Sequence, residues 1–225
     1  MKVVCFDLDD TLYKEIDYLK SAYKEVAHYA AELCGKAGDP VCVLEVKAYD
    51  EMLAAHLGGG NAFERLNEFL GLQEPIADYL KIYREHKPEI ELSEDAVLLL
   101  DWLKENDFVI GLITDGRVNS QTAKIEALGL RRWIKEEDIV ISESFGSTKP
   151  ALENYRFFEE KHGPGSYCYI GDNTEKDFIA PNALGWKTIC LKQDGGNVHR
   201  QSFSCDKDKM PQYVVGSLSE CIKII

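Results

Sequence analysis

An aspartate stands directly after the first apolar run of the chain, and a second aspartate follows two residues later. Residues 3–6 lead into Asp7-Leu8-Asp9-Asp10-Thr11. An aspartate carboxylate can act as a nucleophile, and a second carboxyl group beside it can move protons. The same residue types are also common in turns and at helix caps. By itself this pattern leaves a catalytic and a structural interpretation open.

Three more polar residues occupy equivalent places further along the chain. Thr114 ends the apolar run 108–113, Asp172 closely follows the run 166–170, and Lys149 precedes Pro150. Each has an ordinary explanation: a helix cap for Thr114, an exposed lysine for Lys149, and a turn residue for Asp172. Ligands of open parallel sheets bind beyond the carboxyl ends of the strands. The joint order of these residues therefore favours one shared site.

The elements that must position these residues are visible as alternating patterns. Six short apolar runs predict strands at Val3–Phe6, Phe108–Ile113, Asp138–Ser142, Ser166–Ile170, Lys187–Leu191 and Gln212–Val215. From residue 93 onward helical patterns alternate with them: Ser93 caps a helix through Lys104, a second helix spans Asn119–Leu128, and Pro150 opens a third that reaches about Lys161. This alternation predicts an α/β fold, a Rossmann-like parallel sheet with helices on both faces.

The stretch from about Tyr13 to Pro88 has helical periodicity and no convincing strand. Glycine and proline punctuate it at Gly35–Pro40, Gly58–Gly60 and Gly71–Pro75, which predicts about four helices in an inserted α-helical bundle. We therefore predict two domains. A core domain is made of residues 1–14 and 89–225, and a helical cap domain is made of residues 15–88.

Composition limits the class of protein and its partners. The chain has 225 residues, 45% hydrophobic and 29% charged, which is typical of a globular protein. The 26 basic and 39 acidic residues give a formal charge of −13. Such a charge repels nucleic-acid backbones and anionic membranes, so neither is an expected partner. A small phosphate ester is still an expected ligand, because a local cation and backbone N–H groups reverse the potential inside one cleft.

The first residues and the cysteines indicate a cytoplasmic protein. The opening apolar run is interrupted by Asp7 and is too short for a signal peptide or a membrane span. The seven cysteines include no C-x-x-C pair, and Cys5, Cys168 and Cys190 lie inside apolar runs. We predict buried, reduced thiols there. Cys34 and Cys42 flank a polar turn, but no matching histidine or cysteine pair supports a metal site.

In their order and spacing, the polar residues resemble the four motifs of the haloacid dehalogenase-like (HAD) hydrolase superfamily, over nearly the whole core. D-x-D-x-T is matched by residues 7–11, the strand-terminal Thr/Ser by Thr114, the lysine by Lys149, and G-D-x-x-x-x-D by Gly171, Asp172 and Asp177. The insert between the first and second motifs resembles the helical-cap (C1-type) branch of that superfamily.

The resemblance implies a Mg²⁺-dependent phosphatase acting on a small phosphorylated metabolite. Asp7 is then the nucleophile that forms an aspartyl-phosphate, and Asp9 is the general acid and base. Thr114, Lys149 and the N–H groups of Asp115 and Gly116 are expected to bind the phosphate. Metal ligands are expected from the Asp7 and Asp172 carboxylates and the Asp9 carbonyl, with Asp177 as an outer or alternate partner.

Several other functional hypotheses remain open beside a phosphatase. Asp9 disfavours dehalogenation, because a halide leaves without being protonated, but a phosphomutase keeps both aspartates. A phosphoacceptor switch uses similar residues, although there the acceptor aspartate follows a middle strand in a module about half this length. A catalytically silent relative is a third alternative. The sequence indicates neither the natural substrate nor the oligomeric state. Candidate cap contacts, left outside the predicted site because packing explains them as well, are Tyr13, Lys14, Tyr18, His28, His56 and Arg65.

Overall fold

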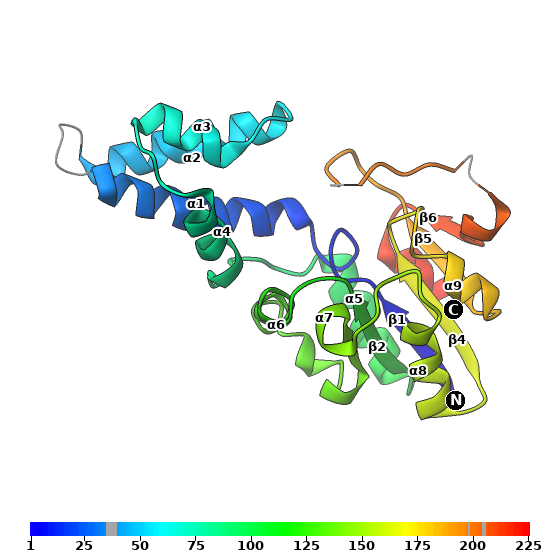
Figure 1. Cartoon of the computed structure of the whole chain (residues 1–225). Helices are drawn as coiled ribbons and strands as arrows, with labels where there is room; N and C mark the ends of the chain where they lie inside the picture. The colour runs from blue at the N-terminus through cyan, green and yellow to red at the C-terminus, as the bar shows by residue number, and fades with distance from the viewer. Residues whose placement is uncertain (35–39, 198, 204–205) are drawn as a thin grey trace. The chain divides into compact units, whose positions relative to one another are not determined.

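The computed structural model describes residues 1–34, 40–197, 199–203 and 206–225 (Figure 1). It divides into two compact units, a core unit of Met1–Ile16 with Ile90–Ile225 and a helical unit of Asp17–Glu89. The sequence boundaries lay at residues 14–15 and 88–89, close to these divisions. Within the described residues, no helix is long and apolar enough to span a membrane.

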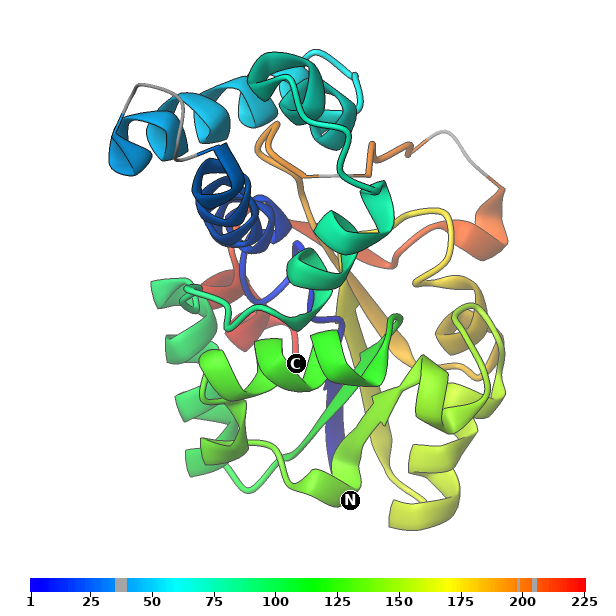
Figure 2. The same cartoon turned by 60° about the vertical axis from the view of Figure 1, so that its left-hand side comes forward.

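The core unit contains a six-stranded, wholly parallel sheet of order β3-β2-β1-β4-β5-β6. Its strands are β1 (Lys2–Phe6), β2 (Val109–Thr114), β3 (Ile139–Ile141), β4 (Ser166–Gly171), β5 (Lys187–Leu191) and β6 (Tyr213–Val215). All six predicted strands are present, and no strand end differs from its prediction by more than one residue. The strand order reverses at β1, which therefore lies in the middle of the sheet (Figure 2).

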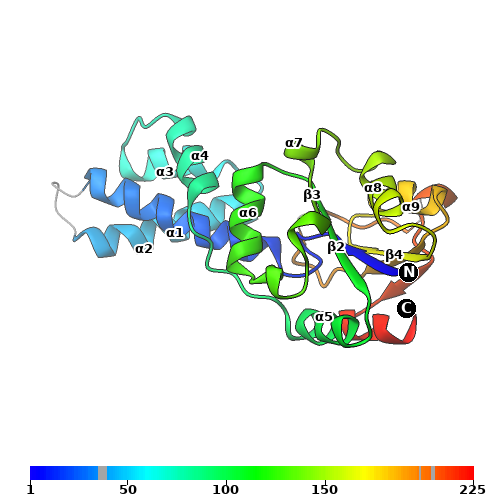
Figure 3. The same cartoon turned by 90° about the horizontal axis from the view of Figure 1, so that it is seen from below.

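Helices cover both faces of this sheet, which confirms the predicted α/β fold class. One face carries α5 (Glu94–Glu105) and α6 (Val118–Ala127), and α5 contacts the C-terminal 3₁₀ helix (Leu218–Lys223) there (Figure 3). On the other face lie α8 (Glu153–His162) and α9 (Ile179–Ala183), with the short helix α7 (Ser142–Phe145) (Figure 3). Crossover helices on both faces bury the parallel strands, which explains their continuous apolar sequences.

The core packs aromatic side chains against the strands. Tyr155, Phe158 and Trp186 are buried with Val3 and Tyr169 in one cluster. Strand residue Gly111 allows this packing, because a Cβ there would lie 2.4 Å from the Phe158 ring. The aromatic residues bury large apolar areas and edge-to-face pairs orient them. The cluster packs against β1 and β4 and so positions the residues that follow these strands.

One predicted helix start is wrong. Pro150 does not open α8, which begins at Glu153. The N–H of Ala151 donates to the carbonyl of Thr148, so a turn separates Lys149 and Pro150 from the helix. By contrast, Ser93 caps α5 as predicted, since its hydroxyl accepts a hydrogen bond from the Ala96 N–H.

The helical unit consists of four helices in its described part. They are α1 (Glu15–Cys34, whose first residues belong to the core unit), α2 (Val41–Leu57), α3 (Ala62–Leu70) and α4 (Ile76–Glu85). Tyr18, Ala22 and Val26 are buried along one face of α1. Gly58 and Gly71 end α2 and α3. Residues 35–39 of the predicted turn Gly35–Pro40 lie outside the described residues.

The six described cysteines are free thiols. Cys5, Cys168 and Cys190 are buried, as predicted. Cys34 is half-buried and Cys42 is exposed. Among the described residues, the group of side chains able to hold a metal ion contains neither of them.

Candidate active site

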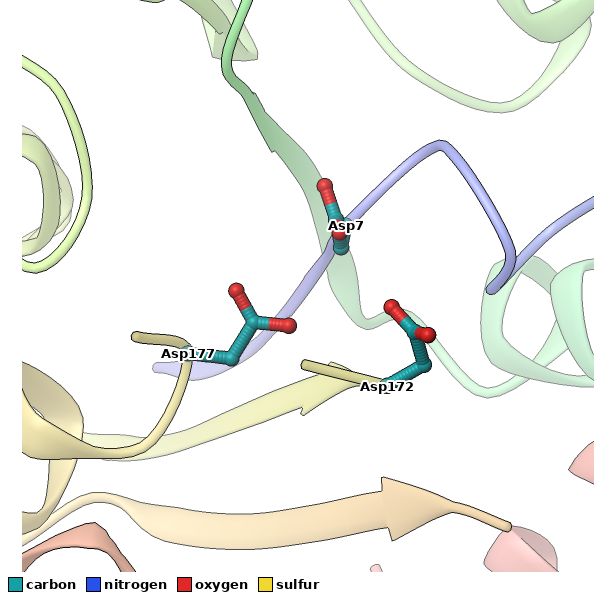
Figure 4. A group of neighbouring side chains, drawn as sticks. All are labelled: Asp7, Asp172 and Asp177. Atoms are coloured by element: carbon teal, nitrogen blue, oxygen red, sulfur yellow. The ribbon is translucent and has the colours of Figure 1, made fainter. Parts of the chain in front are cut away.

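The carboxyl ends of β1 and β4 bring three aspartates together. Asp7 follows β1, Asp172 follows β4, and Asp177 belongs to the loop after β4 (Figure 4). One carboxylate oxygen from each lies within 4.8 Å of the others, and all three side chains are buried. β1 and β4 are paired neighbours, and that pairing, rather than any local sequence feature, creates the cluster.

Gly171 makes this close approach of Asp177 to the strand possible. A Cβ at position 171 would lie 2.5 Å from Asp177 Oδ2. Asp177 is also fixed by the N–H of Asn173, which donates to Oδ2 at 2.9 Å. The spacing of Gly171 and Asp177 in the sequence therefore has a steric reason: only glycine leaves room for the carboxylate.

Lys149 supplies the positive charge at the centre. Its Nζ atom lies 2.7 Å from Asp7 Oδ1 and 2.9 Å from Asp177 Oδ1, and its side chain has no exposed surface. Burial opposes the charge, but Asp177 and Asp7 outweigh it and hold the pKa of Lys149 well above its ordinary value. The backbone N–H of Lys149 donates to Asp115 Oδ1 at 3.1 Å, which fixes the turn that carries the lysine.

One ammonium group does not neutralise three carboxylates. Burial raises the pKa of Asp7 to about 7, against the lowering effect of Lys149. Burial, Asp7 and Asp177 raise the pKa of Asp172 to about 8, although Asn197 donates to its Oδ2 at 2.9 Å. The cluster therefore has an excess of buried negative charge, and its oxygen donors are those that a hard divalent cation prefers. A cation such as Mg²⁺ fits this donor set.

The second aspartate of the pair, Asp9, is held apart from this cluster by other partners. Lys124 donates to its Oδ1 at 2.7 Å, Gln121 donates to its Oδ2 at 3.1 Å, and the Tyr13 hydroxyl also donates to Oδ1. Burial raises the pKa of Asp9, but the Lys124 charge and these hydrogen bonds outweigh it and hold the pKa below its ordinary value. Asp9 is therefore an ionised carboxylate in this arrangement.

Asp10 takes the structural role that the acidic sequence also permits. Its backbone has φ 54°, a left-handed conformation that aspartate tolerates, and its Oδ1 accepts a hydrogen bond from the Glu15 N–H at the start of α1. Within the segment 7–11, Asp10 therefore stabilises the turn, and Asp7 and Asp9 are the aspartates whose carboxylates are candidates for catalysis.

Thr114, Asp115, Gly116 and Lys149 were predicted to bind phosphate, and they lie at the same edge of the sheet as the cluster. The Gly116 N–H is the exception, because it already has a hydrogen-bond partner. Thr114 is buried as the last residue of β2, and its hydroxyl accepts a hydrogen bond from Gln121. The Asp115 carboxylate bonds to the Lys149 backbone and, at 2.8 Å, to Lys176. The N–H of Gly116, however, donates to Ser142 Oγ at 2.9 Å. To reach a phosphate oxygen, it would have to release that hydroxyl.

A cavity of about 100 Å³ opens above these residues. Its lining includes the three aspartates 7, 9 and 172 and also Glu15, whose pKa burial and the charge of Asp9 raise to about 7. Lys176 and His199 are the basic groups in the lining. A larger hollow of about 650 Å³ lies at the start of β4 and β5, but the carboxylate among its lining residues is Glu159 alone. The smaller cavity is the one that holds reactive groups.

The sequence interpretation missed Gln121, Lys124, Lys176, Asn197 and His199. Gln121, Lys124 and Leu128 follow the i, i+3, i+7 spacing of a buried helix face, so polar residues on the apolar side of α6 were a visible signal. Asn197 and His199 belong to a loop, where no periodic pattern exists.

Two other polar residues near the motifs have structural explanations. Asn173 is a turn residue, since its side chain accepts a hydrogen bond from the Glu175 N–H, and Arg117 is exposed.

Together these features define an α/β enzyme with an acidic, cation-accepting centre at the carboxyl edge of a parallel sheet. The chain belongs to the haloacid dehalogenase-like hydrolase family, whose model matches residues 1–185. The prediction of an enzyme of this superfamily is therefore confirmed.

Curated relatives cover the same length. The glyceraldehyde 3-phosphate phosphatase of Methanocaldococcus jannaschii is 26% identical, with 100% of this chain and 97% of the relative covered. The enzyme of that name from Methanopyrus kandleri is 25% identical, with the same coverage. These relatives support the predicted phosphatase class.

Solved structures show the same fold. A HAD phosphatase from Thermococcus onnurineus has a TM-score of 0.61 at 19% identity, with 100% of this chain and 97% of that chain covered. A 2-haloacid dehalogenase from Pseudomonas syringae has a TM-score of 0.65 at 18% identity and the same coverage. Since both a phosphatase and a dehalogenase share the fold, the chemistry must be decided by the site residues.

The surplus of buried carboxylates predicts a pH-dependent stability when no cation is bound. Above the ordinary value of 3.8, the unfolded chain releases the protons of Asp7 and Asp172, whereas the native state keeps them up to about 7 and 8. The free energy of unfolding therefore falls as the pH rises from about 4 to about 8. Each kcal/mol lost lowers Tm by about 2–4 °C in a chain of this size.

Thermal unfolding in chelator between pH 5 and 9 measures this slope. Asp172→Asn should flatten it, because the amide does not titrate, and millimolar Mg²⁺ should raise Tm most at high pH. A Tm that stays constant or rises with pH in the chelated wild type would contradict the buried surplus of charge.

Proposed function

We propose that this protein is a Mg²⁺-dependent phosphohydrolase that removes the phosphate from a small phosphomonoester. The observation that carries the proposal is the carboxylate of Asp7, buried at the end of β1, 2.7 Å from the Lys149 ammonium and clustered with Asp172 and Asp177. A carboxylate in this position is a nucleophile with a neighbouring cation, which is what attack on a phosphate dianion requires.

In the proposed reaction, an Asp7 oxygen forms a bond to phosphorus while the bond from phosphorus to the ester oxygen breaks. The protonated Asp9 gives its proton to the departing alkoxide and becomes a carboxylate. Water then attacks phosphorus, Asp9 takes a proton from it, and the bond from Asp7 to phosphorus breaks. Phosphate leaves with both aspartates restored. The ionised, hydrogen-bonded Asp9 of this structure corresponds to the base of the second displacement.

The remaining residues have distinct proposed tasks. Asp7 and Asp172 would hold Mg²⁺ with the Asp9 carbonyl, and Asp177 would act from outside, because both of its oxygens already have partners. When bound, Mg²⁺ supplies positive charge that lets a carboxylate approach a phosphate dianion. Lys149 adds a second charge, and the Thr114 hydroxyl, accepting from Gln121, keeps its own proton for a phosphoryl oxygen.

Asp9 favours phosphate esters over haloacids as substrates. An alkoxide is a poor leaving group that needs a proton, whereas a halide needs none. By the names of its curated relatives, glyceraldehyde 3-phosphate is the first substrate to test. We also propose that the helical unit, residues 17–89, acts as the cap that selects the leaving group.

Release of inorganic phosphate tests the proposal. The assay uses glyceraldehyde 3-phosphate, phosphoglycolate, sugar phosphates, nucleoside monophosphates and an aryl phosphate, each with excess Mg²⁺ and again with chelator. We expect turnover in chelator to be slower by a factor of roughly 10³ or more. Restoring Mg²⁺ should restore the rate. Equal rates with and without chelator would contradict the metal role, and isomerised ester without free phosphate would indicate a mutase.

A further inference from the structure

The helix α6 presents two buried polar side chains to the site. Gln121 and Lys124 lie one helical turn apart, and only 1% and 5% of their surfaces are exposed. A lysine is rarely buried to this degree without a charged partner, because removing an ammonium group from water is costly. Its partner here is Asp9, with 2.7 Å between Lys124 Nζ and Asp9 Oδ1.

The two side chains hold both oxygens of the same carboxylate. Lys124 donates to Oδ1 and Gln121 Nε2 donates to Oδ2 at 3.1 Å. Gln121 Nε2 is also within hydrogen-bond reach of the Thr114 hydroxyl and, at 3.2 Å, of the Asp115 carbonyl. Three oxygens around Nε2 identify it as the donor end of the amide. Gln121 therefore ties Asp9 to the segment proposed to bind the phosphate.

Gly116 provides the space for this arrangement. Its φ of 151° lies in a region that side chains avoid, and a Cβ there would lie 3.0 Å from both Cγ and Cδ of Gln121. A residue other than glycine would press on the Gln121 side chain. The glycine is thus matched to the position of Gln121 above Thr114.

We propose that Lys124 and Gln121 are positioning residues that orient the carboxyl group of Asp9 for proton transfer to and from the ester oxygen and water. This proposal rests on the proposed phosphatase function and assigns roles to two residues outside the predicted site. A carboxylate held at both oxygens has one orientation, and proton transfer requires an oxygen within about 2.6–3.2 Å of the accepting atom. Small misplacements of a catalytic group reduce rates strongly.

The dependence on the leaving group tests this role. For Lys124→Met and Gln121→Met, kcat/KM is measured with an alkyl phosphate and with p-nitrophenyl phosphate. The alkyl ester should lose roughly 10²-fold or more, because its alkoxide needs a positioned acid, whereas the nitrophenyl ester should lose under about 10-fold. Lys104→Met is the control: Lys104 is exposed on α5 and donates to the Arg132 carbonyl. It should behave as the wild type with both esters.

A double-mutant comparison separates orientation of Asp9 from a general structural effect. If Lys124 acts through Asp9, then Asp9→Asn with Lys124→Met should be no slower than Asp9→Asn alone. Equal losses of both esters in the single variants, or further loss in the double variant, would overturn the proposal. Circular dichroism and thermal unfolding verify that each variant folds, and Gln121→Met keeps the test decisive if Lys124→Met does not.

The outcome for the wild type distinguishes the two proposals. A wild-type protein that hydrolyses no phosphate ester contradicts the proposed function itself. A wild-type protein that is active and loses activity with Asp9→Asn, but keeps it with both α6 variants, contradicts only the positioning role.

Discussion

Replacing Asp7 with Asn is expected to lower kcat by roughly 10⁴-fold or more while leaving the fold intact. The amide has nearly the shape of the carboxylate but is not a nucleophile toward phosphorus. Steady-state release of phosphate with Mg²⁺ present measures the loss. Near-normal turnover would show that Asp7 is not the nucleophile.

The same Asp7→Asn variant, although it loses activity, should not lose thermal stability. Burial raises the pKa of Asp7 to about 7, so at pH 8 the native state carries an unfavourable carboxylate charge. Asp7→Asn should then raise Tm, or leave it unchanged, in chelator at pH 8. Asp107→Asn is a matched control. Asp107 is an exposed turn residue with φ 59°, a conformation that asparagine also adopts, so its activity should be normal.

Replacing Lys149 with Met is expected to reduce both activity and stability. Its ammonium group lies between Asp7 and Asp177, and without it two buried carboxylates face each other. Removing one partner of a buried ion pair costs about 3–5 kcal/mol, which corresponds to a fall in Tm of roughly 10 °C. We expect kcat/KM to fall by roughly 10²–10³-fold, as for the loss of one preorganised donor to a developing charge.

A second variant separates the two roles of Lys149. Lys149→Met combined with Asp177→Asn removes one of the opposed carboxylates, so it should recover much of the lost Tm without recovering activity. Lys161→Met is the matched control, because Lys161 pairs with the buried Asp138 at 2.8 Å, and Asp138 is not among the residues that line the acidic cavity. That control should lose stability and keep kcat. Recovery of activity in the double variant would contradict a catalytic role for the Lys149 charge.

The phosphate-binding predictions show where reasoning from motifs is incomplete. The order of Asp7, Thr114, Lys149 and Asp172 indicated one shared site. The ends of β1, β2 and β4 bring Asp7, Thr114 and Asp172 to one edge of the sheet, and the turn before α8 brings Lys149 to Asp7. The Gly116 N–H, by contrast, has a partner in Ser142, which follows β3. A hydrogen bond between the residues that follow two strands depends on which strands are neighbours, and the local sequence does not determine that. The start of α8 was also misplaced, since a turn at Thr148–Ala151 precedes the helix.

The sequence by itself determined the strands and most helices, because apolar periodicity, caps and glycine breaks act over a few residues at a time. It also indicated the pair of aspartates, since Asp7 and Asp9 are only two residues apart in the chain. Only the tertiary structure decided what surrounds them. Pairing of β1 with β4 brings Asp172 and Asp177 beside Asp7, and the packing of α6 brings Lys124 to Asp9, 115 residues away in the chain. Burial then shifts the pKa values of these carboxylates, because each one loses its contact with water and instead faces other carboxylates and a few fixed hydrogen-bond donors.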